Sequence, residues 1–152
     1  MILLKLLSKS ASRLRINDKP PAFVYDSQGM DNYEMDNVPH WSVNVPVLEE
    51  TFTFDQFQVL NYNIPVSMYI VSELNRESEY YDEIFSKLLS ARDRFLKEMD
   101  SHRDTEGRRL CTVNGQIAIR TTFIAQSMNF DTPATAIIFN LPVTITKFQP
   151  LC

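Results

Sequence analysis

The hydrophobic pattern between residues 61 and 85 changes its period halfway along. In NYNIPVSMYIVSELNRESEYYDEIF, polar and apolar positions first alternate, as in a strand with one buried face. The predicted buried face carries Tyr62, Ile64, Val66, Met68 and Ile70, and the opposite face carries Asn61, Asn63, Ser67 and Tyr69. The spacing then becomes helical from about Asn75 to Asp100. The apolar stripe of that helix consists of Tyr81, Ile84, Phe85, Leu88, Leu89, Phe95, Leu96 and Met99.

A second helical pattern opens the chain. Residues 2–16 place Leu3, Leu6, Leu7, Ala11 and Leu14 at helical spacing, which predicts a short amphipathic helix. The tract NDKPP, residues 17–21, is expected to end it, because proline restricts the preceding residue and donates no backbone hydrogen bond. The stretch is rich in Ser and Arg, like a mitochondrial presequence, but we expect it to remain part of the folded protein.

The remaining apolar runs predict strands and their connections. Strands are expected at residues 22–25, 41–47, 50–60, 61–72 and 135–148, with Trp41, Val43, Val45 and Val47 on one side of the second. A skipped beat at Asp55–Gln56 predicts a bulge or a bend. Pro46 and Pro65 place their strands at a sheet edge, or at a point where a ladder bond is missing. Asn114-Gly115 lies between alternating runs and predicts a type I′ hairpin.

This order of elements predicts an α+β fold with a mainly antiparallel sheet. A short N-terminal helix and one long helix, at about residues 75–100, flank the sheet. The 152 residues form a single domain, with residues 1–19 as a basic helical arm and residues 26–40 as an acidic loop.

Composition excludes several common chemistries. The chain has only 3 glycines, too few for a phosphate-cradling loop. Cys111 and Cys152 form no metal or redox motif and are expected to be free thiols, although a disulfide between them stays open. His40 and His102 are expected to be solvated loop residues, without a Cys–His nucleophile. We therefore predict no catalytic residue, no cofactor and no membrane contact.

Three further candidates have weaker patterns. The loop with Asp26, Asp31, Glu34 and Asp36 could bind a divalent cation, but its spacing does not fit an EF-hand, so a solvated acidic loop is expected. Glu49 and Glu50 are adjacent on a strand and point to opposite faces, which disfavours a glycosidase pair. The aromatic residues near Trp41 lack the interleaved basic residues of a nucleic-acid platform, and we expect them in a core or an interface.

Charge is distributed unevenly along the chain. Residues 1–19 hold five basic residues (Lys5, Lys9, Arg13, Arg15 and Lys19) and one acidic residue, for a net charge of +4. Residues 20–75 hold eight acidic residues and no Lys or Arg, for a net charge of −8, and residues 110–152 are almost uncharged. The basic arm could fold over the chain's own acidic surface, or contact the acidic surface of a neighbouring copy in a closed ring. An uncharged C-terminal segment is typical of an interface core.

The element order closes with NIPVSMYIVSELNRESEYYDEIFSKLL, a hairpin and IIFNLPVTIT. From residue 41 onward it resembles the tail terminator and tail-completion proteins of tailed bacteriophages. The resemblance implies an α+β fold and a ring between the head-side connector and the tail, with no catalytic residues. The basic first helix and the acidic loop are not features of that family.

These observations predict a structural virion protein that forms a homo-oligomeric ring in the phage neck. Its predicted interface comprises Lys5, Lys9, Arg13, Arg15, Asp26, Asp31, Glu34, Asp36, Glu49 and Glu50. Neighbouring portal, connector or tail proteins would contact the ring, and DNA would pass through it without sequence-specific binding, since an acidic surface repels a polyanion. The alternatives are a small soluble module that binds a host or viral partner, and a metal-dependent enzyme that uses the acidic loop.

Overall fold

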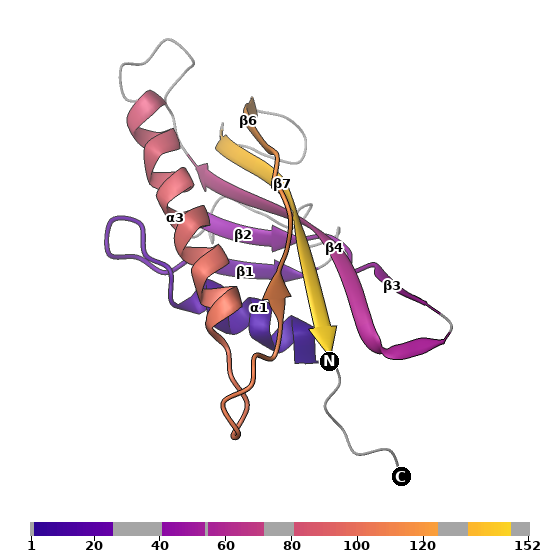
Figure 1. Cartoon of the computed structure of the whole chain (residues 1–152). Helices are drawn as coiled ribbons and strands as arrows, with labels where there is room; N and C mark the ends of the chain where they lie inside the picture. The colour runs from indigo at the N-terminus through magenta and orange to yellow at the C-terminus, as the bar shows by residue number, and fades with distance from the viewer. Residues whose placement is uncertain (1, 26–40, 54, 72–80, 125–133, 147–152) are drawn as a thin grey trace.

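A computed structural model describes residues 2–25, 41–53, 55–71, 81–124 and 134–146 of the chain (Figure 1). The helices and strands within these residues are α1 (Ile2–Ser12), β1 (Ala22–Tyr25), β2 (Trp41–Val45), β3 (Glu50–Thr53), β4 (Gln56–Val71), α3 (Tyr81–Ser101), β5 (Thr112–Val113), β6 (Ile119–Ile124) and β7 (Ala134–Thr146). The predicted long helix is confirmed from Tyr81 onward, and its expected first turns lie outside the described residues.

The strands form one mixed sheet that is mostly antiparallel, as predicted. Its main path runs β1-β2-β4-β7-β5, with β3 paired to β4 and β6 paired to β7. Only the β1–β2 pair is parallel among the described pairings. The two longest strands, β4 and β7, pair over residues 59–71 and 134–146 and form the centre of the sheet.

Each central strand changes its outer neighbour partway along its length. Strand β4 pairs with β2 through residues 67–70 and with β3 through residues 56–62. Among the described pairings, Pro65 therefore lies where β4 pairs with β7 alone, so its missing N–H removes no bond on the outer side. The edge-strand prediction from Pro65 is wrong, and the alternative of a missing ladder bond fits the register. Pro46 follows the end of β2, which is also an inner strand.

The predicted hairpin at Asn114-Gly115 is wrong. Strands β5 and β6 do not pair with each other; both lie antiparallel along the same edge of β7. Gly115 has a φ of 70°, but Asn114 does not share the positive φ that a type I′ turn requires. The backbone N–H of Asn114 instead donates to the Pro142 carbonyl, 3.0 Å away. The glycine thus marks an interruption in one edge of the sheet.

The skipped beat at Asp55–Gln56 marks a reversal of the chain. Thr53 pairs with Gln56, so β3 and β4 form a hairpin, and the predicted single strand over residues 50–60 is divided in two. The register between the strands also shifts between Thr51 and Thr53. This hairpin projects from the sheet beyond the area that the helices cover (Figure 1).

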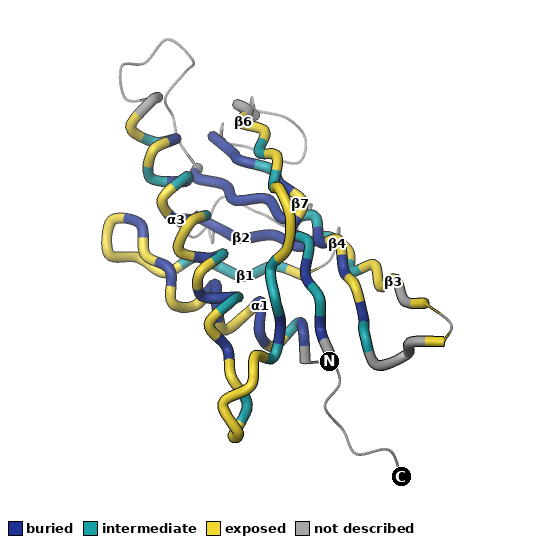
Figure 2. The backbone as a smooth tube through the Cα atoms, viewed as in Figure 1, coloured by how far each residue is buried: buried dark blue, intermediate teal, exposed yellow. Residues whose placement is uncertain are grey.

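Helices α1 and α3 cover one face of the sheet. Their buried side chains share one hydrophobic core with alternate residues of β2, β4 and β7 (Figure 2). The largest fully buried side chains include Trp41, Phe95, Leu3, Leu7, Leu14, Ile64, Met68, Leu88, Met99, Ile137 and Leu141. Burying a leucine side chain contributes about 1.5–3 kcal/mol. The predicted apolar stripe of α1 therefore belongs to the core, although the helix ends at Ser12, before the proline tract.

The opposite face of the sheet is partly exposed and mostly uncharged. Asn61, Asn63 and Asn140 are exposed on it, as predicted for the first two, but Ser67 and Tyr69 on the same face are buried. In β2, Trp41, Val43 and Val45 are buried as one face, as predicted. Val47, the fourth residue predicted on that face, lies beyond the strand and is 53% exposed. The low charge of residues 134–146 follows from the central position of β7 in the sheet.

Candidate functional site

Hydrogen bonds within the turn between α1 and β1, and one from Lys87 to the turn, place it beside helix α3. Ile16 and Lys19 exchange backbone hydrogen bonds of 3.0 Å, and between them Asn17 and Asp18 have φ values of 52° and 64°. These left-handed conformations suit Asn and Asp better than most other residues. Indole Nε1 of Trp41 donates to the Lys19 carbonyl over 2.8 Å. This fixed turn forms one wall of a groove.

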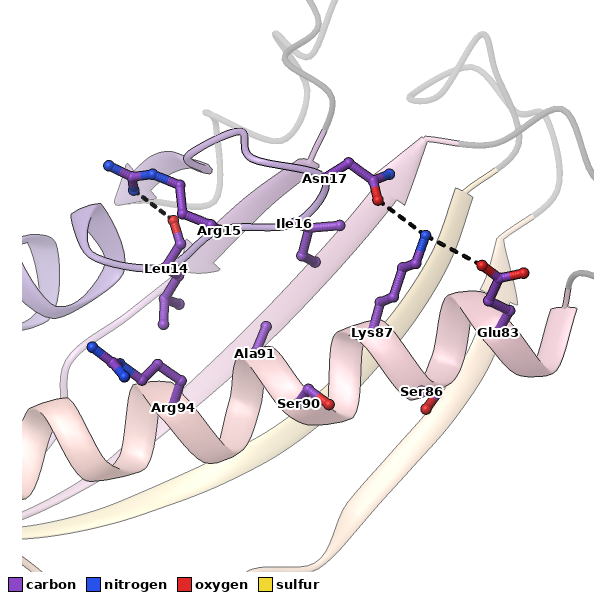
Figure 3. A pocket seen from close by; sticks show the side chains of 10 residues that line it. All are labelled: Leu14, Arg15, Ile16, Asn17, Glu83, Ser86, Lys87, Ser90, Ala91 and Arg94. Carbon is purple, nitrogen blue, oxygen red and sulfur yellow. Dashed lines mark hydrogen bonds and ion pairs between the residues drawn. The ribbon is translucent and has the colours of Figure 1, made fainter.

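The groove lies between that turn and the outer side of α3, and its volume is about 320 Å³ (Figure 3). Leu14 and Ile16 are buried beneath the turn, and Ala91 is buried on the helix. Polar side chains surround these apolar residues. The described lining residues are Leu14, Arg15, Ile16, Asn17, Glu83, Ser86, Lys87, Ser90, Ala91 and Arg94. We call this space the basic groove.

Three cationic side chains give the basic groove its charge. Lys87 Nζ lies 3.0 Å from Asn17 Oδ1 and 3.5 Å from the carboxylate of Glu83, the only acidic residue in the described lining (Figure 3). Arg94 forms an ion pair of 2.9 Å with Glu98 and is 64% exposed.

Arg15 donates to the carbonyls of Ser12 and Leu14, each 2.7 Å away. Among the described residues, no carboxylate lies within ion-pair distance of Arg15.

This arrangement can bind an anion. Guanidinium groups offer paired N–H donors that match the geometry of a carboxylate or a phosphate. The exposed hydroxyl side chains of Ser86 and Ser90 add neutral donors along the helix.

A second groove, of about 480 Å³, lies between α1 and β1. It contains Lys5 and Lys9, both exposed, together with Phe23 and the 41% exposed Tyr25. The predicted basic residues of the arm therefore separate. Lys5 and Lys9 line this second groove, and Arg15 lines the basic groove.

Arg13 is directed inward, toward α3. Its Nη1 lies 2.7 Å from Glu98 Oε2, whose side chain is 11% exposed. The hydrogen bond from Arg13, with the charges of Arg13 and Arg94, lowers the pKa of Glu98 despite its burial. Arg13 therefore folds back onto its own chain. Its partner, Glu98, lies on α3 and not in the acidic middle of the chain, where the charge pattern had suggested a contact.

The prediction of a solvated His102 is wrong, because this side chain is only 6% exposed. Its Nε2 lies 2.7 Å from Oγ of Ser10, which also contacts Met99 Sδ at 3.2 Å. Burial, and then the positive charges of Arg13 and Lys9, lower the pKa of His102. A Ser–His pair suggests nucleophilic chemistry, but Ser10 is fully buried. A nucleophile must reach its substrate, so the pair has a structural role here.

Cys111 is a free thiol, as predicted, and it is buried; Cys152 lies outside the described residues. The thiol donates to the Met99 carbonyl over 3.0 Å. Burial raises the pKa of Cys111 to about 11, with a contribution from Asp100. A protonated thiol of this kind is a poor nucleophile.

Three acidic residues lie along the β3–β4 hairpin: Glu49 precedes β3, Glu50 is its first residue, and Asp55 lies in the turn. Glu49, Glu50 and Asp55 are all exposed. Tyr62 donates to Glu50 over 2.7 Å, and burial together with this bond raises the pKa of Tyr62 to about 12. None of the three acids has an ion pair with a described residue of its own chain. We call these residues the acidic hairpin.

The other predicted acids, Asp26, Asp31, Glu34 and Asp36, lie outside the described residues, as does the proposed cation loop. Within the part of the chain that is described, no cluster of three potential metal ligands occurs.

Sequence reasoning missed Lys87 and Arg94. Both belong to the long helix, far from Arg15 in sequence, and the path of the α1–β1 turn brings Arg15 beside them.

The chain matches no protein-family model and none of the curated proteins. In the described ranges, no helix is both long enough and apolar enough to cross a membrane.

Proposed function

We propose that this protein is a non-enzymatic subunit of a homo-oligomeric ring in the head–tail connector of a tailed bacteriophage, similar to a tail terminator. It would act in the virion after assembly in the host cytoplasm. Its partners would be further copies of itself and the neighbouring portal, connector or tail proteins.

The observation that supports this proposal best is the opposite charge of two distant parts of the molecule. The β3–β4 hairpin projects at one end of the sheet, and the α1–β1 turn lies beside α3 at the other (Figure 1). The basic groove lies between that turn and α3. Two different complementary patches on one chain favour head-to-tail association, which closes into a ring when the rotation between subunits allows it. The α+β fold supports the same assignment, since it is the fold that the resemblance implies.

The uncharged part of the sheet has a place in this assembly. Asparagine and threonine side chains connect β4 and β7 to the residue that follows β5: Asn114 Nδ2 lies 2.6 Å from Thr144 Oγ1, which donates to Asn61 over 2.9 Å. Such a surface could support the ring or line its channel without attracting DNA. Acidic residues that faced the channel would repel the passing polyanion.

The leucine residues of α1 argue against the alternative of a small binding module that inserts this helix into a partner. Leu3, Leu6 and Leu7 are buried in the protein's own core, so they are occupied before any partner groove could receive them.

Size-exclusion chromatography with light scattering, at about 0.05 M and about 1 M salt, tests the ring directly. We expect a closed oligomer at low salt that weakens at high salt, and ring-shaped particles by electron microscopy. A monomer under both conditions would contradict self-assembly. Thermal stabilisation by calcium or magnesium would then favour the metal-dependent alternative.

A further inference from the structure

We propose that the basic groove of one copy receives the acidic hairpin of the next copy. This inference rests on the proposed ring and names the contact that would build it. It adds Lys87 and Arg94 to the interface and assigns Lys5 and Lys9 no part in this contact.

The chemistry of the groove selects a carboxylate ligand. Arg15 and Arg94 supply two guanidinium groups at one end of the groove, and Lys87 supplies an ammonium group toward the other end (Figure 3). Arg15 has only backbone carbonyls as acceptors among the described residues, so its charge is available to an incoming acid. Charge-assisted hydrogen bonds of this type are about twice as strong as neutral ones.

The acidic hairpin has the complementary properties. Glu49, Glu50 and Asp55 lie within seven positions of one another and are exposed. Among the described residues they have no cationic partner in their own chain. Their hairpin extends away from the helices, where a neighbouring molecule can approach it (Figure 1).

The contact must be intermolecular. The hairpin and the α1–β1 turn lie on opposite sides of the molecule, with the sheet between them (Figure 1). One copy therefore offers a hairpin on one side and a groove on the other, which is the requirement for repeated head-to-tail contacts.

The second groove is the weaker candidate for the same hairpin. Its described lining offers two lysines and no guanidinium, beside the aromatic side chains of Phe23 and Tyr25. Ammonium groups are more strongly hydrated than guanidinium groups and do not bind carboxylates in a paired geometry. Lys5 and Lys9 therefore provide a matched control. Reversing their charges changes the net charge of the chain by the same amount as reversing two cationic residues of the basic groove, but at a different surface.

The experiment compares sedimentation of four full-length chains at low salt: wild type, Arg15→Glu with Lys87→Glu, Glu49→Lys with Glu50→Lys, and the control Lys5→Glu with Lys9→Glu. We expect each of the first two double variants to raise the dissociation constant at least about tenfold. The control should assemble like the wild type. Circular dichroism and thermal unfolding establish that every variant folds.

Neutral variants separate the contact from the ring. Arg15→Ala with Lys87→Ala retains a hairpin, and Glu49→Gln with Glu50→Gln retains a groove. Each alone should be a monomer, and an equal mixture should form a dimer that cannot extend. If both charge-reversed variants assemble like the wild type, or if only the control variant fails to assemble, this contact is wrong but the ring proposal stands. A wild-type chain that remains monomeric, with no dimer in the mixture, overturns both.

Discussion

At the scale of single residues, the most consequential side chain is His102. It is buried beside Ser10, with Lys9 and Arg13 as positive neighbours and Glu98 as a negative one. The hydroxyl of Ser10 has one proton. If that proton is donated to Met99 Sδ, the Nε2 of a neutral histidine must be the donor to Ser10. Protonation of His102 would place a second positive charge beside Arg13.

Acid should therefore destabilise the protein through His102. The folded-state pKa of His102 is below its usual value of 6.5, so the unfolded chain binds more protons as the pH falls below that value. We expect the free energy of unfolding to decrease between about pH 7.5 and about pH 5.5, and His102→Gln to reduce this slope. Urea titrations at several pH values measure it.

The variant His40→Gln shows how much of the pH dependence of the free energy of unfolding comes from the other histidine. Glu98 contributes in the same direction but at lower pH, because its pKa is lowered from 4.5 and its stabilising effect is lost only as that carboxylate is protonated. A slope unchanged in His102→Gln would contradict the buried, neutral histidine.

At the scale of elements, helix α1 is part of the hydrophobic core, although its positive charge alone suggests an exposed arm. The net charge of +4 in residues 1–19 suggests an arm that reaches outward. However, Leu3, Leu7 and Leu14 are fully or almost fully buried, and Arg13 is paired with α3. The helix presents its lysines to solvent while its leucines complete the core.

Leu7→Ala should consequently destabilise the whole domain. The side chain of Leu7 is fully buried, and truncation of such a leucine typically costs about 2–5 kcal/mol. Chemical denaturation followed by tryptophan fluorescence reports on the shared core, because Trp41 belongs to it. Leu4→Ala, at a partly buried position of the same helix, is the control and should cost less. A loss for Leu7→Ala no larger than that of the control would show α1 to be a detachable arm.

Elements with one buried face could be predicted from the sequence. Periodicity predicted α1, α3 and β4, because each has one face in the core over many residues, and β7 was predicted from a long, mostly buried apolar run. The partners of the short strands could not be predicted. Asn114-Gly115 has the composition of a hairpin turn, yet β5 and β6 both find their hydrogen bonds along β7. That choice depends on an exposed edge of a strand more than ten residues away in sequence.

The candidate site was predictable only in part, for a related reason. Arg15, Glu49 and Glu50 were identified from the contrast in charge along the chain. Lys87 and Arg94 have the spacing of ordinary charges on the exposed side of a helix. They acquire a common surface with Arg15 only when the α1–β1 turn, fixed by Ile16 and Lys19, packs beside α3.

At the scale of the whole molecule, assembly and stability should be linked. A contact that forms only between folded copies stabilises the folded state by mass action. Each tenfold increase in protein concentration above the dissociation constant then contributes about 1.4 kcal/mol, which raises the unfolding temperature by about 3–5 °C for a domain of this size. A monomer would show no such dependence.

We therefore expect the thermal midpoint to rise with protein concentration at low salt and to become independent of concentration at about 1 M salt, where the Debye length is about 3 Å. Differential scanning calorimetry over a hundredfold range of concentration, roughly two such steps, measures both effects. The charge-reversed groove, Arg15→Glu with Lys87→Glu, should behave at low salt as the wild type does at high salt. A rise that persists at high salt would point to an apolar interface between copies, because screening weakens exposed charge pairs but leaves buried hydrocarbon contacts in place.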